Sequence, residues 1–210
     1  MERLAIDLVD HFPYEYMHLI CLGVMKKLFT LWLTGSLNVR LRAASIEKIS
    51  SIFKEMRTCV PWEFQRKPRS LKEFKRFKAT ELREILCYYG PVAFKADLKK
   101  HVYEHFLTLH VAVRILASPN YCIEQNEYAH SLLLYFVKNF PLIYGSKCVS
   151  YNVHGLVHVA RDVLHFGPLD SYSAFQFENF LQIIKKMLRK SEKPLQQICN
   201  RVSEIGNPFL

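Results

Sequence analysis

Glu15 is the first residue whose type and surroundings could support chemistry. It stands between aromatic residues in the string FPYEYMH, directly before a long apolar run. A carboxylate in such a place is partly desolvated, and metal binding or ion pairing would offset that cost. The alternative is a glutamate at a helix N-terminus, where the helix dipole favours a negative charge. Residue chemistry alone favours this helix-end alternative.

Glu178 is the second candidate, within the amphipathic string SAFQFENFLQIIKKMLRK. On a helix it would share one stripe with Gln182, Lys185 and Arg189. A carboxylate beside cations on one helix face could hold a metal at one end and phosphates along the rest. Ordinary pairing of charges on a solvated face is the alternative, and the residue pattern alone favours it. The buried face of this helix is expected to consist of Phe177, Phe180, Leu181, Ile184, Met187 and Leu188.

Three histidines and an aspartate, His154, His158, Asp162 and His165, fall on one side of a single expected helix. Two histidines four residues apart can share a zinc ion. The chain has no HExxH string and no closely spaced cysteine pair to complete such a site. Histidines hydrogen-bonded to their neighbours in a core or an interface are therefore the favoured interpretation.

A basic segment, residues 66–78, carries seven cations against the single acid Glu73. Clusters of this kind neutralise phosphates and bind nucleic acid with a strong salt dependence. Phe74 and Phe77 are interleaved with the cations, and we expect them in the core instead of stacked on bases. The predicted DNA-binding cations of this segment are Arg66, Lys67, Arg69, Lys72, Lys75, Arg76 and Lys78, and those near Glu178 are Lys185, Lys186 and Arg189.

Composition supports one folded, basic, helical domain. Of 210 residues, 50% are hydrophobic, which excludes a disordered tail, and the 7 glycines favour helices over turn-rich β folds. The net charge of +10 fits a polyanionic partner. The six cysteines show no CxxC pair and are expected to be reduced thiols. We expect no signal peptide and no membrane partner, because the longest apolar stretch, residues 28–33, is too short to span a bilayer.

Hydrophobic spacing predicts helices along most of the chain. The clearest covers 97–117, where Leu98, Val102, Phe106, Leu109, Val113 and Leu116 recur three or four residues apart. Gly90-Pro91 and Pro141 are expected to stop the helices that precede them. The sequence also allows a short β edge at 9–14, the expected β edge of this chain. The other helices are expected at 16–34, 44–57, 70–89 with a break near 79–80, 124–140, 150–165, 174–190 and 195–205.

Three strings, taken in order, resemble CACTA (En/Spm-like) transposases and their animal relatives. PYEYMHLICLGVMKKL resembles their "P-x-D-x-MH…LGV" segment. KPRSLKEFKRFKATELREILCYYGPVAFK resembles the segment that follows. VSYNVHGLVHVARDVLHFGPLDSYSAFQFENFLQIIKKMLR resembles the closing "NxHxLxHLxxDVxxxGPL…FxFExxxxxxK" block.

The resemblance implies a DDE-type transposase with an RNase-H-like core, in which three carboxylates hold two Mg²⁺ or Mn²⁺ ions for phosphoryl transfer. Glu15 would stand at the family's second acidic position, normally Asp, and Glu178 at its final Glu. Both would be catalytic metal ligands, with about 160 residues of helical insertion between them. Two departures stand against activity. Glu replaces Asp at position 15, and Asp7 and Asp10 are too close to Glu15 to supply the first Asp, so we expect a fragment.

The sequence thus predicts a mainly α fold, an insertion-type helical domain with remnants of an RNase-H-like core. We expect a single domain, with 1–35 around the second acidic position, 36–148 as the insertion and 149–210 as the closing segment. The expected function is nuclear DNA binding by a transposase-derived fragment that is no nuclease on its own. Two alternatives remain open: a helical module that binds proteins such as other transposase-like subunits, and part of an active transposase completed by upstream sequence.

Overall fold

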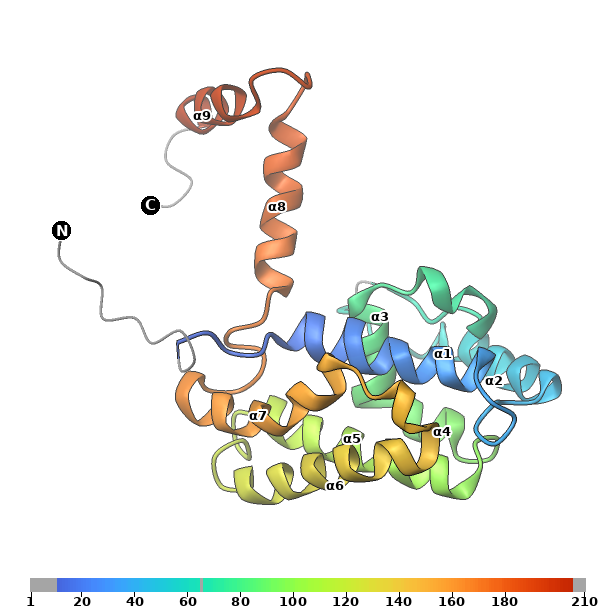
Figure 1. Cartoon of the computed structure of the whole chain (residues 1–210). Coiled ribbons are helices and arrows are strands. Elements are labelled where there is room, and N and C mark those ends of the chain that lie inside the picture. The colour runs from blue at the N-terminus through green and yellow to red at the C-terminus, as the bar shows by residue number, and fades with distance from the viewer. Residues whose placement is uncertain (1–10, 65, 206–210) are drawn as a thin grey trace. The chain divides into compact units, whose positions relative to one another are not determined.

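Helices account for the regular secondary structure of the computed structural model, which describes residues 11–64 and 66–205 (Figure 1). The expectation of a mainly α chain is confirmed. Residues 11–14 form no strand, and residues 9 and 10 of the expected β edge lie outside the described residues. The chain divides into two compact units, unit 1 (Met1–Tyr172) and unit 2 (Ser173–Leu210). The prediction of one single domain stays a prediction.

A long apolar helix forms the centre of unit 1. It begins as a π-helix, η1 (Met17–Met25), and continues directly as α1 (Lys26–Thr34). Gly35 ends it, as expected, and donates its N–H to the Leu31 carbonyl at 3.0 Å. Its mean hydropathy of 1.3 and its 18 residues would suffice to cross a membrane, but the core helix of a folded protein meets the same criterion. Half of this helix is buried inside the protein.

Aromatic rings from several elements meet at the C-terminal half of this helix. Phe29 and Trp32 lie edge-on to Phe94, with ring centroids 5.9 and 5.3 Å apart. Trp32 also meets Phe106 at 5.6 Å, and Phe53 meets Phe94 at 6.0 Å. Edge-to-face pairs contribute about 0.5–1.5 kcal/mol each beyond the burial of their area. The cluster therefore ties α1 to three other helices of unit 1.

The remaining helices of unit 1 are arranged about η1 and α1 (Figure 1). α5 packs along α6, α6 along α7, and α7 and α3 both contact η1, whereas α2 contacts η2 and α4. All six residues of the 97–117 pattern are buried, which confirms that helix and its core face.

The bounds of the other elements are as follows. Unit 1 contains α2 (Ala43–Met56), η2 (Leu71–Arg76), α3 (Ala79–Glu84), η3 (Ile85–Tyr89), α4 (Gly90–Phe94), α5 (Lys100–Ala117), α6 (Asn126–Tyr144), η4 (Ser146–Cys148) and α7 (Tyr151–Phe166). Unit 2 contains α8 (Phe175–Met187) and α9 (Pro194–Ile205).

Two expected helix stops are wrong, and both involve proline. Pro91 lies in the first turn of α4, where no backbone N–H is needed, and the π-turn before it closes with Gly90 donating to Ile85. Pro141 lies in the last turn of α6, which continues to Tyr144. That helix ends only at Gly145, whose φ of +94° lies in the left-handed region that favours glycine.

The prediction that α8 has a buried apolar face is also wrong for unit 2 taken by itself. No residue of α8 is buried, and Phe177, Phe180 and Leu181 are exposed. The physical reason is the size of the unit, since two short helices cannot enclose an apolar stripe on their own. The extents of α8 and α9 agree with the helices expected at 174–190 and 195–205.

The crossing of η1 and α7 offers a test of the fold. A Cβ added at Gly23 would lie 2.4 Å from the Asn152 side-chain nitrogen and 2.9 Å from its Cβ. We expect Gly23→Ala to lower the free energy of unfolding by about 1–3 kcal/mol, as overpacking does. Urea denaturation measures this change. Asn152→Gly in the same chain should recover most of the loss, and a Gly23→Ala variant as stable as the parent would contradict this packing.

Candidate nucleic-acid interface

The basic segment leads from the loop after α2 through the 3₁₀ helix η2 to the start of α3. Leu71, Phe74 and Phe77 recur every third residue and are buried, with exposed fractions of 0%, 8% and 3%. A 3₁₀ helix has three residues per turn, so side chains three apart share one edge. The apolar edge therefore faces the core, and the cations occupy the other edges. The prediction that both phenylalanines are core residues is confirmed.

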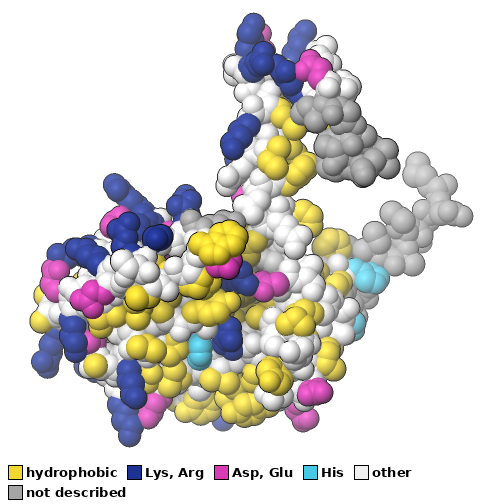
Figure 2. Space-filling view, turned by 180° about the vertical axis from the view of Figure 1, so that it is seen from behind, with side chains coloured by type: hydrophobic (Ala, Val, Ile, Leu, Met, Phe, Trp, Pro, Cys, Tyr) yellow, Lys and Arg dark blue, Asp and Glu magenta, His cyan; other side chains and the backbone are white. Residues whose placement is uncertain are grey.

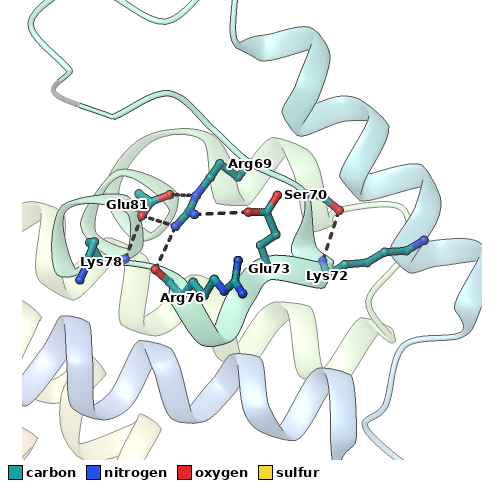
Figure 3. A network of polar contacts seen from close by, with 7 residues as sticks. All are labelled: Arg69, Ser70, Lys72, Glu73, Arg76, Lys78 and Glu81. Carbon is teal, nitrogen blue, oxygen red and sulfur yellow. Dashed lines mark hydrogen bonds and ion pairs between the residues drawn. The ribbon is translucent and has the colours of Figure 1, made fainter.

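Arg69 fixes the conformation of the basic segment through hydrogen bonds of its guanidinium (Figure 3). Its guanidinium donates to both carboxylate oxygens of Glu81, at 2.7 and 2.9 Å, and to the Arg76 carbonyl at 2.9 Å. A third nitrogen lies 3.3 Å from Glu73. Hydrogen bonding to Glu81 raises the pKa of Arg69. We call Arg69 with Glu81 the clamp.

The clamp also fixes the start of α3. Glu81 is buried, and its second oxygen accepts the backbone N–H of Lys78 at 2.9 Å. The Arg69 guanidinium also lies over the Phe77 ring, 5.5 Å from its centroid. Charge-assisted, forked hydrogen bonds of this kind fix geometry as well as adding stability. The backbone from 69 to 81 is therefore tied at both ends.

Six of the seven predicted cations of the segment are exposed. Lys72 forms an ion pair with the exposed Glu47 on α2, a surface contact of small energetic worth. Arg69 differs, because its guanidinium is engaged by the clamp. Figure 2 shows Lys and Arg side chains gathered on one part of unit 1, interspersed with a few acids. The exposed set is Arg66, Lys67, Lys72, Lys75, Arg76 and Lys78.

A buried carboxyl lies behind the segment. Glu84 is buried on α3, and burial, with the nearby Glu81 charge, raises its pKa to about 7. The positive charges of Arg83 and Arg66 oppose that rise.

Three predicted cations belong to unit 2. Lys185 and Lys186 are exposed in the last turn of α8, and Arg189 is exposed just beyond it. The backbone N–H of Arg189 donates to the Gln197 side chain at 2.9 Å, which links the turn to α9. Glu178 lies in the first turn of α8 and is exposed.

Glu15 occupies the N-terminal end of η1. Its two carboxylate oxygens accept the backbone N–H groups of Met17 and His18, each at 2.8 Å, and the His18 ring nitrogen lies at 2.6 Å. This is the arrangement of a capping carboxylate at a helix N-terminus. The helix-end alternative thus accounts for the local geometry, and the catalytic role remains a prediction.

The expected metal site does not emerge from the described residues. Among residues 11–64 and 66–205, no three His, Cys, Asp or Glu side chains converge to hold an ion. Glu15 has three hydrogen-bond donors around its carboxylate. The role of Glu15 and Glu178 as ligands of Mg²⁺ or Mn²⁺ stays a prediction.

The histidine stripe on α7 serves packing. The His158 ring stacks on Tyr14 at 5.4 Å, and the His165 ring bonds to the carbonyl of Arg161 one turn earlier. Asp162 is buried and accepts the Tyr14 backbone N–H at 2.8 Å, and burial raises its pKa. These contacts agree with the favoured interpretation of histidines bonded to their neighbours.

No family model, no curated protein and no solved structure matches the chain.

Two features of the interface escape inspection of the sequence. Glu81 is twelve residues from Arg69, so neither turn nor helix spacing pairs them. Trp62 stands in the short proline-bounded loop before the basic segment and is 88% exposed. A tryptophan in a polar loop next to a charge cluster is the one signal that could have drawn attention to it.

The clamp predicts a sharp difference between Arg69 and its neighbours. Arg69→Ala leaves the buried Glu81 carboxylate unpaired, and we expect it to lower the free energy of unfolding by about 2–4 kcal/mol. The matched control Lys75→Ala removes an exposed cation and should change it by less than about 0.5 kcal/mol. Chemical denaturation measures both. Equal effects of the two substitutions would refute the clamp.

Glu84 predicts a pH-dependent stability. Its folded pKa of about 7 exceeds the ordinary value of 4.5, so its contribution is fully present below pH 4.5 and is lost as pH rises towards 7. Glu84→Gln removes the buried charge. Relative to the parent protein, we expect the variant to gain melting temperature progressively between pH 4.5 and 7, with a constant gain above. A gain that does not vary with pH would show that Glu84 does not titrate in this range.

Proposed function

We propose that the chain is a nucleic-acid-binding protein whose basic segment contacts the phosphates of DNA. The observation that carries the proposal is the clamp. It turns one edge of η2 into the core and leaves Lys75, Arg76 and Lys78 exposed along a fixed backbone. Cations presented in this way can neutralise phosphates without first ordering a loop, which lowers the entropic cost of binding.

The charge of the whole chain supports the same partner. Lys and Arg exceed Asp and Glu by ten. The only acids within the basic segment and its clamp are Glu73 and Glu81, and both face Arg69. The exposed cations are therefore not neutralised by these acids. A long-range attraction to a polyanion, screened by salt, follows from this distribution.

The transposase-derived origin belongs to the same proposal. It rests on the three ordered strings that resemble CACTA transposases, and the mainly helical unit 1 is compatible with the helical insertion they imply. The residues around Glu178 would then be a remnant of the RNase-H-like core. We propose DNA binding without strand cleavage by this chain, acting in the nucleus, with Mg²⁺ or Mn²⁺ needed only where upstream sequence completes a catalytic centre.

A second candidate function is protein binding, and α6 favours it. Tyr128, Tyr135 and Leu142 recur every seven residues on its outer face and are 56%, 55% and 80% exposed. Exposed apolar stripes of this length mark interaction surfaces. On this alternative the chain is a helical interaction module that binds other transposase-like subunits.

Salt-dependent binding to duplex DNA tests the first proposal. We expect a fluorescently labelled duplex of about 20 base pairs to bind at low salt, with a slope of log affinity against log salt that scales with the phosphates contacted. Lys75→Glu with Arg76→Glu should weaken binding by about tenfold or more and reduce the slope by about two. Fluorescence anisotropy measures both quantities.

A matched pair of substitutions controls for net charge. Lys138→Glu with Lys147→Glu changes the charge equally at exposed positions on α6 and η4. We expect this pair to leave the affinity within about twofold. Absence of binding to any DNA at low salt, paired or unpaired, would remove the DNA proposal and leave the protein-binding alternative. Equal loss in both pairs would show that the basic segment is not the interface.

A further inference from the structure

Exposed aromatic residues lie in the loop before the basic segment and on η3. Trp62 is 88% exposed and Tyr88, on η3, is 47% exposed. The Phe64 ring lies 5.2 Å from that of Tyr88. The Arg114 guanidinium of α5 stands over the Tyr88 ring, 5.1 Å from its centroid. We call Trp62, Phe64, Tyr88 and Arg114 the aromatic platform.

The fold presents these rings to solvent for identifiable reasons. The other four residues of η3 are buried, so Tyr88 is the position at which this helix meets the surface. A turn closed by the Phe64 N–H and the Pro61 carbonyl, 3.2 Å apart, returns the loop towards Tyr88. Phe64 and Arg114 then approach Tyr88 from the loop after α2 and from α5. The contacts hold the Tyr88 ring in one orientation before any ligand arrives.

The platform and the basic segment are neighbours in space. The Phe64 ring contacts Tyr88, and Arg66, the first cation of the basic segment, is only two residues beyond Phe64 in the chain. Figure 2 shows hydrophobic and basic side chains adjoining one another on this face of unit 1. Exposed rings bordered by cations are poorly suited to an apolar protein partner and well suited to a polyanion that carries flat rings.

We propose that the aromatic platform stacks on unpaired bases, so that the protein prefers single-stranded nucleic acid to a fully paired duplex. The inference rests on the proposed function and adds the substrate class. Bases inside a duplex already stack on each other, whereas unpaired bases expose their faces to protein aromatics. Trp62 and the exposed part of the Tyr88 ring supply stacking surfaces, Arg114 adds a positive charge beside Tyr88, and the basic segment contacts the phosphates.

Labelled oligomers of one length separate stacking from charge. The probes are oligothymidine of about 20 nucleotides, an abasic deoxyribose-phosphate oligomer of equal length, and a 20-base-pair duplex. We expect oligothymidine to bind more tightly than either, and oligouridine to bind like oligothymidine, because stacking needs no particular sugar. Equal affinity for oligothymidine and the abasic oligomer would overturn the proposal.

Substitutions in the platform provide the second arm. Trp62→Ala and Tyr88→Ala should each weaken oligothymidine binding by about tenfold and leave duplex binding within about twofold. Tyr88→Phe should retain the parent's affinity. Tyr128→Ala, at a comparably exposed tyrosine on α6, is the matched control and should have no effect. Thermal melting of each variant checks the fold, which these exposed side chains do not support.

The outcomes distinguish the two proposals. No binding of any probe at low salt overturns the proposed function itself. Binding to duplex and single strand alike, unchanged by Trp62→Ala and Tyr88→Ala but lost with Lys75→Glu and Arg76→Glu, retains the basic segment as the interface and overturns the platform alone.

Discussion

Phe77 is the residue through which the core and the charged surface of unit 1 depend on each other. Its ring lies edge-on to Phe29 at 5.8 Å, and the Arg69 guanidinium lies over it, 5.5 Å from its centroid. Six exposed cations within thirteen residues repel one another, so the segment needs attachments that outweigh that repulsion. The apolar edge of η2 gives one and the pairing of Arg69 with Glu81 gives the other. Because both meet at Phe77, the surface charge is arranged by the same packing that organises the centre of the unit.

The helices of unit 1 could be predicted largely from hydrophobic spacing, because the burial of one face determines where each begins. The six apolar residues of α5 show this, since all are buried. The errors concern Pro91 and Pro141, where a rule valid for helix interiors was applied near helix ends. The π-helical turns of η1 and η3 leave no comparable pattern in the sequence. Elements from other parts of the chain, α3 and α7, pack on η1, and such contacts are not visible in the local sequence.

The site was predictable only as a list of cations. Counting charges treats Arg69 and Lys75 alike. In the structure Arg69 pairs with the buried Glu81 and supports the fold, whereas Lys75 stays exposed on the surface. For Glu15 the helix-end alternative described the geometry correctly, because a carboxylate before an apolar helix meets unsatisfied backbone N–H groups first. Contacts between residues far apart in the chain, such as Arg114 with Tyr88, have no sequence signature.

The position of the two tryptophans has a practical consequence for spectroscopy. Trp32 is fully buried in the aromatic cluster, and Trp62 is 88% exposed in its loop. With only these two tryptophans in the chain, the intrinsic emission consists of a blue-shifted component sensitive to unfolding and a red-shifted component accessible to iodide or acrylamide. One unlabelled sample therefore carries an internal reporter for the core and a separate one for the loop, and selective quenching can tell which of the two a change of conditions affects.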